Sequence, residues 1–196
     1  MIAIIDYNAG NIGSITNALG KLGAAYIVTS EPKKILQAEK VIFPGQGRAG
    51  PAMNDLRQKK LDQVLKKVTQ PFLGICLGMQ LLLPFSEEDN TECLGTIPGR
   101  VRHFQEKNLK VPQIGWNTIN KAKNDLLFEG IPDNVFVYFV NSYYVDVQPE
   151  YILGETEYGK TKTATIIKKN NFYGTQFHPE KSGIWGIKML NNFINL

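Results

Sequence analysis

Cysteine, histidine and long apolar stretches are scarce in this chain, and each scarcity excludes a class of protein. The 196 residues include only 2 histidines and 2 cysteines, and two cysteines are too few for a disulfide framework. Cys93 has no second cysteine or histidine at metal-site spacing, so we interpret it as an idle thiol and expect no metal. The first apolar run ends at Ile5 and follows no basic leader, and it is too short for a signal peptide or a membrane span. We therefore expect a soluble, cytoplasmic protein that needs neither a membrane nor a cofactor.

Strong charge of either sign is also lacking. The formal net charge is +4 and the pI is about 8.9, and the lysines are scattered instead of clustering with aromatic residues. Nothing in this pattern indicates nucleic-acid binding. What is present is an ordinary globular composition, with 43% hydrophobic and 20% charged residues. A chain of this length buries one substantial core without disulfides, so residues 1–196 are expected to form a single domain.

The first part of the chain alternates short apolar runs with stretches of helical periodicity. Such short runs are typical of buried strands, and the spacing of leucine, isoleucine and valine between them indicates amphipathic helices. The expected strands are 2–6, 26–29, 41–43 and 72–75, and the expected helices are 12–22, 32–38, 56–68 and 77–83. This β-α-β-α order with short connections predicts an α/β fold, in which a mostly parallel central sheet is flanked by helices on both faces.

From about Leu94 the pattern changes to strands joined by turns. The expected strands are 101–104, 117–119, 135–140, 152–157, 163–168 and 172–177, and one terminal helix is expected from about Lys181. Consecutive strands without intervening helices are typical of antiparallel pairing. We expect an additional β-rich, partly antiparallel second half that is laid against the parallel sheet.

The sequence Gly74-Ile75-Cys76-Leu77-Gly78 lies where an expected strand gives way to an expected helix. Small residues on both sides of Cys76 let the backbone turn sharply, which is the geometry of a nucleophile elbow. The free N–H groups that open a helix favour a thiolate at this position, and the Leu77 N–H is placed to bind an oxyanion. The alternative is that Cys76 is a small buried core residue, which is the commoner fate of a free cysteine.

A glycine-rich loop, residues 44–50, follows the third expected strand. Its residues 45–50 match G-x-G-x-x-G, the dinucleotide fingerprint. That fingerprint belongs after the first strand of a fold and needs an acidic residue about twenty positions further on. The acid nearest to that place, Asp62, falls within an expected helix. Glycines at the carboxyl end of a strand also let N–H groups approach a ligand closely, and an oxyanion-binding loop beside Cys76 would use them in that way.

His178 and Glu180 lie two residues apart in a segment expected to be extended, which points both side chains to one side. Pro179 stiffens the backbone between them. An imidazole held by a carboxylate can take the proton of a thiol and give it to a leaving nitrogen, as nucleophilic acyl transfer requires. The alternative is a surface turn in which Glu180 pairs with Lys181. The other histidine, His103, lies on a strand-like stretch and is interpreted as structural or exposed.

Three of these blocks, GICLGMQLL at 74–82, PGQG at 44–47 and GTQFHPEKSG at 174–183, resemble class I (triad-type) glutamine amidotransferases in order and spacing. More narrowly, DYNAGNIGS near the start, PQIGWN at 112–117 and YFVNSYY at 138–144 resemble the glutaminase subunits of imidazole glycerol phosphate synthases, which belong to histidine biosynthesis. The resemblance covers essentially the whole chain. It implies the fold of that family, a flavodoxin-like parallel sheet flanked by helices.

The resemblance further implies that the chain hydrolyses L-glutamine to glutamate and ammonia through a cysteine thioester. Cys76 would attack the side-chain carboxamide, His178 would act as acid and base, and Glu180 would orient the imidazole. The oxyanion hole would comprise Gly45, Gln46, Gly47 and Leu77. The glutamine would be held by Gln80, Ser142 and Tyr143. The partner interface and the ammonia exit would include Asn11, Trp116, Tyr138 and Lys181.

A glutaminase of this kind needs a partner, because ammonia in neutral water is mostly ammonium and must reach its acceptor through a sheltered passage. One glutaminase domain accounts for the whole chain, so the acceptor site is expected on another polypeptide. In the resembled enzyme that polypeptide is a (β/α)8-barrel cyclase, which makes imidazole glycerol phosphate and AICAR. We therefore expect a heterodimer, and low glutaminase activity from the isolated chain.

Three positions depart from the pattern of the resembled family. A small apolar residue is common where Gln46 stands, and histidine is frequent where Gln113 and Asn141 stand. These differences leave open a paralogous subunit that feeds ammonia to another synthase, for example in sugar amidination for surface polysaccharide. A stand-alone cysteine hydrolase is a further alternative. A third is a non-catalytic scaffold or nucleotide-binding domain that uses the 45–50 loop.

Overall fold

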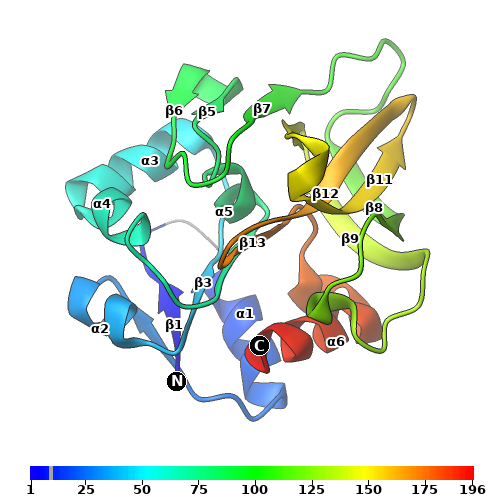
Figure 1. Ribbon diagram of the computed structural model, residues 1–196. Coiled ribbons are helices and arrows are strands. Elements are labelled where there is room, and N and C mark those ends of the chain that lie inside the picture. The colour runs from blue at the N-terminus through cyan, green and yellow to red at the C-terminus, as the bar shows by residue number, and fades with distance from the viewer. Residues whose placement is uncertain (9–10) are drawn as a thin grey trace.

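The parallel part of the sheet is built from short, apolar strands. The computed structural model describes residues 1–8 and 11–196, and Figure 1 shows their arrangement. Neighbouring strands pair in parallel in the order β2-β1-β3-β4-β13. Their bounds are β1 (Ile2–Ile5), β2 (Tyr26–Thr29), β3 (Lys40–Phe43), β4 (Phe72–Ile75) and β13 (Phe172–Thr175). Every residue of β1, β4 and β13 is buried, as strands covered on both faces should be. The predicted α/β fold is confirmed.

Helices cover both faces of these strands, so that two apolar cores form. The core on one face contains α1 (Ile12–Lys21) and α6 (Gly183–Ile194), which lie together in Figure 1. The core on the other face contains α2 (Pro32–Gln37), α3 (Ala49–Gln58) and α4 (Leu61–Leu65). Successive strand residues alternate between the cores, as the period of a strand requires: Ile4 joins the first and Ile5 the second. The connection from β1 to α1 includes residues 9 and 10, which lie outside the described residues.

The single helix expected at 56–68 is in fact two helices. Helix α3 ends at Gln58 and α4 begins at Leu61, because Lys60 adopts a left-handed backbone with φ of 56°. Leu61 is nevertheless buried in the same core as the apolar residues of α3. The apolar spacing therefore continues across the break, which is why periodicity alone could not detect it.

The helix expected at 77–83 is shorter than predicted. Helix α5 spans Leu77–Gln80, and the following residues tighten instead of continuing the helix. The N–H groups of Leu82 and Leu83 each donate to a carbonyl three residues back, at 3.1 Å, which is the bonding of a 3-10 turn. This tighter turn ends at Pro84, which has no N–H with which to continue a helix.

The remaining strands form the expected β-rich, partly antiparallel half. Strand β12 (Thr161–Lys169) runs antiparallel to β13, and the sheet continues through β10 (Tyr143–Asp146), β7 (Arg100–His103), β5 (Phe85–Ser86) and β6 (Thr91–Glu92). Strand β11 (Ile152–Tyr158) joins β12 to an antiparallel ribbon of β8 (Gln113–Lys121) and β9 (Val135–Asn141). Strands β5, β6 and β10 were not predicted, because the first two hold two residues each and β10 buries only Val145 fully.

Short 3-10 helices complete the described part of the chain. Their bounds are η1 (Glu88–Asn90), η2 (Leu126–Phe128), η3 (Pro149–Tyr151) and η4 (Pro179–Lys181). Two of them, η1 and η4, carry residues of the site described below. Within residues 1–8 and 11–196, no helix has the length and apolar character needed to cross a membrane.

Candidate active site

The turn between β4 and α5 holds Cys76 in a rare backbone conformation, and the chain packs so closely around this turn that the neighbouring positions must be glycine. Its backbone has φ of 55° and ψ of −111°, a region that non-glycine residues rarely adopt. A Cβ atom added at Gly78 would lie 2.0 Å from the Phe43 carbonyl oxygen, and one at Gly74 would lie 2.7 Å from the Gly78 carbonyl oxygen. Both glycines of the G-x-C-x-G pattern are therefore required, and the predicted sharp turn is present.

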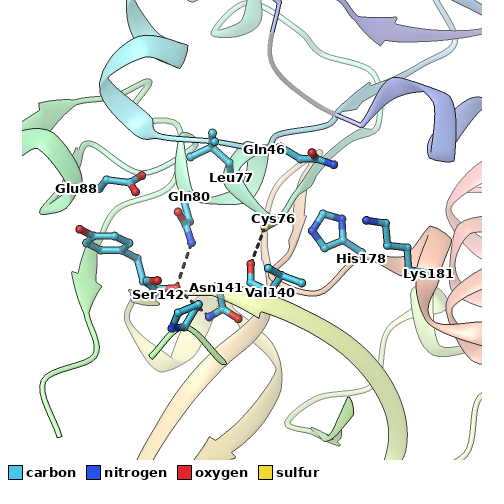
Figure 2. Close-up of a pocket in the computed structure, with 13 residues that line it drawn as sticks. Gln46, Cys76, Leu77, Gln80, Glu88, Val140, Asn141, Ser142, His178 and Lys181 are labelled. Carbon is cyan, nitrogen blue, oxygen red and sulfur yellow. Dashed lines mark hydrogen bonds between the residues drawn. The ribbon is translucent and has the colours of Figure 1, made fainter. Parts of the chain in front are cut away.

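Strand pairing places Cys76 beside the segment that carries the histidine. The Cys76 N–H donates to the Thr175 carbonyl oxygen at 2.7 Å, extending the parallel pairing of β4 with β13. The Cys76 thiol donates to the Val140 carbonyl oxygen and accepts from Gln176 Nε2, each at 3.8 Å. In Figure 2 the sulfur lies between the Val140 carbonyl and the His178 ring. The sequence did not single out Gln176, although it stands inside the quoted 174–183 block.

His178 and Glu180 form a buried pair. The Nδ1 atom of His178 lies 2.9 Å from Oε1 of Glu180, and the two side chains are 6% and 1% exposed. The predicted extended conformation is wrong, because Pro179 starts the 3-10 turn η4, which brings the carboxylate back to the ring. The alternative pairing of Glu180 with Lys181 is also wrong, since Glu180 is buried whereas Lys181 is exposed.

Main-chain and hydroxyl contacts hold the imidazole in place. The His178 N–H donates to the Tyr138 carbonyl oxygen at 3.1 Å. Ser182 links the same two residues, because its hydroxyl donates to the His178 carbonyl oxygen at 2.6 Å and accepts from the Tyr138 N–H at 2.9 Å. The histidine segment is thereby attached to β9, the strand that forms the opposite wall of the site.

The surroundings of His178 favour its protonated form. Burial lowers the pKa of His178, but hydrogen bonds with Cys76 and Glu180 outweigh burial and raise that pKa from 6.5 to about 10. A negative sulfur and a negative carboxylate both stabilise an imidazolium. The His178 imidazole therefore carries its proton at neutral pH.

The loop after β3 packs directly on the turn that carries Cys76. A Cβ atom at Gly45 would lie 2.4 Å from the Gly78 nitrogen and 2.7 Å from the Leu77 Cβ, so only glycine fits there. Gly47 has φ of 90°, a conformation that favours glycine. The predicted oxyanion loop and the first residues of α5 are thus in contact.

The N-terminus of α3 is already occupied by carboxylates, which argues against the dinucleotide reading of residues 45–50. The Ala49 N–H donates to Oε2 of Glu88 at 2.8 Å, and the Gly50 N–H donates to Oδ2 of Asp89 at 3.3 Å. Arg48 forms an ion pair with Asp89. These are the N–H groups that would have to receive a pyrophosphate. Asp62 lies on α4, half-buried.

A cavity of about 370 Å³ opens over Cys76, large enough for an amino acid. Among its lining residues are nine that the sequence predicted, namely Gln46, Gly47, Cys76, Leu77, Gln80, Ser142, Tyr143, His178 and Lys181. Gln80 is buried, and its amide nitrogen donates to the Tyr143 carbonyl oxygen at 3.2 Å and to Oε1 of Gln176 at 3.0 Å. Gln80 therefore fixes the 142–143 wall of the cavity.

Glu88 is a cavity residue that the sequence analysis missed. Burial raises the pKa of Glu88, and the Ala49 N–H that it accepts acts in the opposite direction. Figure 2 shows its carboxylate on the side of the cavity away from His178. Its position in a short acidic turn after β5 gave no signal, because nothing in the local pattern connects that turn to Cys76.

Three of the four residues predicted to face a partner lie at the cavity or on the β8–β9 ribbon: Lys181 lines the cavity, and Trp116 and Tyr138 are on the ribbon. Trp116 and Tyr138 are opposite each other on the ribbon, with ring centroids 5.9 Å apart. Trp116 also approaches Gly183, two residues beyond Lys181. Asn11 has a local role as well, because its side chain accepts from the Ser14 N–H at 3.3 Å and caps α1.

Two of the departing positions are paired across the ribbon. Gln113 lies opposite Asn141, and both side chains are buried. Asn141 Nδ2 donates to the Tyr143 carbonyl oxygen at 3.0 Å, while its Oδ1 has no hydrogen-bond partner among residues 1–8 and 11–196. Asn141 lines the cavity, as does Gln46, the third departing position.

His103 and Cys93 stand apart from these groups. The His103 ring packs on the edge of Tyr143 with centroids 5.0 Å apart, and the main-chain N–H of His103 donates to Oε2 of Glu87 at 2.8 Å. Cys93 is half-buried, and burial raises the pKa of its thiol to about 12. Neither lines the cavity over Cys76, which agrees with a structural histidine and an idle thiol.

The sequence matches known proteins along its whole length. Residues 3–196 match the family described as "Glutamine amidotransferase class-I", and the chain belongs to that family. A relative from Bacteroides fragilis, named imidazole glycerol phosphate synthase subunit HisH, is 48% identical over 100% of this chain and 99% of its own length. A relative from Methanococcus maripaludis, named subunit HisH 1 of the same synthase, is 48% identical over 100% of both chains. A third, from Legionella pneumophila strain Paris and named subunit HisH 2, is 47% identical over 100% of this chain and 98% of its own.

Solved structures agree on the fold. A crystal structure described as a glutamine amidotransferase superposes with a TM-score of 0.77 at 14% identity, covering 100% of this chain and 98% of the other. A structure of PurLQS from Thermotoga maritima gives a TM-score of 0.73 at 16% identity, covering 99% of this chain and 97% of that one. At these identities the likeness concerns the fold alone.

Proposed function

We propose that this chain is a glutaminase subunit that hydrolyses L-glutamine and supplies the ammonia to a cyclase making imidazole glycerol phosphate in histidine biosynthesis. The observation that carries the proposal is the buried His178 and Glu180 pair beside Cys76, in a cavity of amino-acid size. Identities of 47–48% over the full length of the synthase subunits support the choice of acceptor. We assign residues 1–196 to one domain, because a single hydrogen-bonded sheet extends through both halves. We place it in the cytoplasm, where a catalytic thiol stays reduced.

In the proposed reaction, the Cys76 sulfur attacks the carboxamide carbon of glutamine. The carbonyl electrons move onto oxygen, and N–H groups of Leu77 and of the Gly45–Gly47 loop receive that oxyanion. His178 donates its proton to the nitrogen, the C–N bond breaks, and ammonia leaves while the γ-glutamyl group remains on sulfur as a thioester. A water molecule that gives its proton to His178 then attacks the thioester, which releases glutamate and restores the thiolate.

The environment of His178 fits the first of these proton transfers. An imidazole whose pKa is raised to about 10 by Cys76 and Glu180 carries its proton at neutral pH. That proton is available for the leaving nitrogen as the sulfur attacks. Glu180 holds Nδ1, so the other ring nitrogen faces the reaction, which is the orienting role of the carboxylate in a triad.

The charges of the cavity suit a zwitterionic amino acid bound with its amide at Cys76. Glu88 supplies a carboxylate on the side of the cavity away from His178, where it would receive the α-ammonium group of glutamine. The wall at Ser142 and Tyr143, fixed by Gln80, would contact the rest of the amino-acid backbone. We therefore add Glu88 to the predicted glutamine-binding residues.

The β8–β9 ribbon offers a surface for the cyclase. Side chains alternate between the two faces along each strand of the ribbon. One face carries five large side chains, which we call the outward row: Ile114, Trp116, Phe136, Tyr138 and Val140. Three of them, Ile114, Trp116 and Phe136, are 55–58% exposed. Large exposed apolar side chains grouped on one face are typical of a protein interface. The row runs toward Asn141 at the cavity edge. A (β/α)8-barrel cyclase bound there would therefore enclose the path by which ammonia leaves the cavity.

The decisive experiment is to copurify the chain with the cyclase encoded in the same genome and to measure glutamate release. We expect slow hydrolysis by the isolated chain, faster hydrolysis in the complex, and a further increase when imidazole glycerol phosphate is added to the complex. Complex formation without any glutamate release in any of these conditions would contradict the proposal. Full activity of the isolated chain, unchanged by the cyclase, would instead support the stand-alone cysteine hydrolase.

The departures at Gln46, Gln113 and Asn141 favour one second candidate, a paralogous subunit that serves another synthase. All three lie in or beside the cavity wall, where they would meet a different partner first. The same assay distinguishes it, because such a subunit would neither bind the histidine-pathway cyclase nor respond to imidazole glycerol phosphate. It would still hydrolyse glutamine with its own synthase.

A further inference from the structure

Tyr7 carries a deeply buried hydroxyl that the proposed reaction does not use. It follows β1, its side chain is fully buried, and its ring packs on Phe43 with centroids 5.1 Å apart. The hydroxyl donates to the Pro44 carbonyl oxygen at 2.8 Å. A buried polar group of this kind is costly unless its hydrogen bond is made. This hydrogen bond, the one that the hydroxyl makes with the described residues, therefore determines where the hydroxyl must point.

The position of Pro44 makes this contact relevant to the site. Pro44 directly precedes Gly45, and the Pro44 carbonyl belongs to the same planar peptide group as the Gly45 N–H. In a trans peptide the oxygen and the hydrogen point in opposite directions. The Tyr7 hydroxyl, by holding the Pro44 oxygen, therefore fixes the direction of the Gly45 N–H and of the chain that enters the loop.

The other end of the loop is held independently. Glu88 and Asp89 accept from the Ala49 and Gly50 N–H groups, so the chain leaving the loop is attached to η1. Between these two attachments, Gly45 packs against the first turn of α5. Tyr7 is thus the side-chain attachment at the entrance of the Gly45–Gly47 loop, and Glu88 and Asp89 are those at its exit.

The hydroxyl is also a reliable donor. Burial raises the pKa of Tyr7 above its ordinary value, and the negative charges of Cys76 and Asp55 raise it further. The phenol therefore keeps its proton wherever the protein is folded.

We propose that Tyr7 is a positioning residue for the oxyanion hole: its hydroxyl holds the Pro44 carbonyl and thereby sets the backbone of Gly45–Gly47 over Cys76. This inference rests on the proposed glutaminase function. It assigns Tyr7 no contact with glutamine and no part in proton transfer. Its effect is on the stabilisation of the transition state, while the binding of the ground state stays unchanged.

The test compares Tyr7→Phe with the wild type, both in complex with the cyclase. Because the oxyanion forms after glutamine binds, we expect kcat for glutamate release to fall about tenfold while KM stays within about twofold. The matched control is Tyr158→Phe, which removes a hydroxyl that also donates to a main-chain carbonyl, that of Lys110. The control is expected to keep the wild-type kcat.

Two further measurements separate positioning from structural damage. Alkylation of Cys76 by iodoacetamide displaces iodide from a saturated carbon and forms no oxyanion, so its rate should match the wild type. An aldehyde analogue of glutamine forms a tetrahedral adduct with Cys76, and its affinity should fall about tenfold, whereas the affinity of glutamate should not change. The ratio of these two affinities does not depend on how much of the variant is folded.

The outcomes also separate this inference from the proposed function. Equal losses of aldehyde and glutamate affinity, slower alkylation, or an unchanged kcat in Tyr7→Phe would each overturn the role of Tyr7. A wild-type complex that releases no glutamate would overturn the glutaminase function itself, and the role of Tyr7 with it. A wild-type complex that turns over normally beside an unaffected variant refutes only the positioning role.

Discussion

The two walls of the cavity are built in opposite ways. On the wall formed by the ends of β4 and β13, the side chains of Cys76, His178 and Glu180 are buried, and each has a partner within the chain. On the wall formed by the β8–β9 ribbon, apolar side chains of the outward row face solvent, with Trp116 55% exposed. One wall hides polar groups, and the other exposes apolar ones.

This contrast indicates which functions the chain performs alone. Buried polar groups keep their positions because the surrounding hydrogen bonds fix them, so the reacting side chains are already placed in the isolated chain, and the cyclase is expected to raise the rate without supplying them. Exposed apolar side chains contribute favourable free energy only when another surface covers them and removes them from water. Substitutions on the first wall should therefore stop the reaction with the fold intact, whereas substitutions on the second wall should lower the affinity for the partner.

The largest expected effect is that of Cys76→Ala, which removes the proposed nucleophile. Glutamate release by the complex should fall by a factor of about 10⁴ or more, while thermal unfolding and cyclase affinity stay close to the wild type. Cys93→Ala is the matched control and should keep full activity, since Cys93 lies apart from the cavity. Substantial turnover in Cys76→Ala would show that the nucleophile is assigned wrongly.

A smaller loss is expected for Glu180→Gln. The change keeps the shape of the side chain but removes the negative charge that stabilises the His178 imidazolium, so kcat should fall about 100- to 1,000-fold. The exposed Glu129 provides the control, because Glu129→Gln removes the same charge far from the ring. Steady-state kinetics of the two complexes measure the difference, and equal values would contradict the orienting role of Glu180.

On the opposite wall, Trp116→Ala should weaken the cyclase complex and not the chemistry. Truncating a large aromatic side chain at the centre of an interface typically raises Kd about 10- to 100-fold. Titration calorimetry with the cyclase measures this change, and kcat at saturating cyclase should remain near the wild type. The control is Leu126→Ala, which shortens a side chain that is 66% exposed but lies outside the outward row. An unchanged Kd for Trp116→Ala would remove the ribbon from the interface.

Glu88→Gln separates substrate binding from catalysis within the cavity. Glutamine keeps an oxygen for the Ala49 N–H but loses the charge that would attract the α-ammonium group. The KM for glutamine should therefore rise about tenfold, with a smaller change in kcat. Glu92→Gln, on the neighbouring strand β6, removes an exposed charge and should leave KM unchanged. A loss confined to kcat would indicate that Glu88 acts through α3 and not through the substrate.

The smallest signal is a shift in the titration of His178, followed by nuclear magnetic resonance of the imidazole. In the wild type His178 should stay protonated through neutral pH and lose its proton only toward pH 10. Negative neighbours raise this pKa and burial lowers it, so Cys76→Ala and Glu180→Gln should each move the midpoint to lower pH. A wild-type midpoint near 6.5 would contradict the proposed ion pair.

Sequence reasoning succeeded where a local pattern is imposed by close contact. The G-x-C-x-G spacing indicated the turn at Cys76, because any side chain at Gly78 would collide with Phe43. It failed for tertiary contacts that no recognisable motif marks. Glu88 reaches the cavity, and Tyr7 reaches Pro44, through tertiary contacts that leave no periodic trace. The break at Lys60 was missed because apolar spacing continues across it.

The pairing of β13 with β4 has a consequence for the synthesis of the protein. Thr175 lies beside Ile75 in that pairing, so the thiol and its base meet only after the chain between them has been translated and the last strand has docked. A nascent chain that has emerged only as far as β12 contains Cys76 but lacks His178. An incomplete chain on the ribosome is therefore expected to hydrolyse no glutamine, and activity can begin only after β13 has paired with β4.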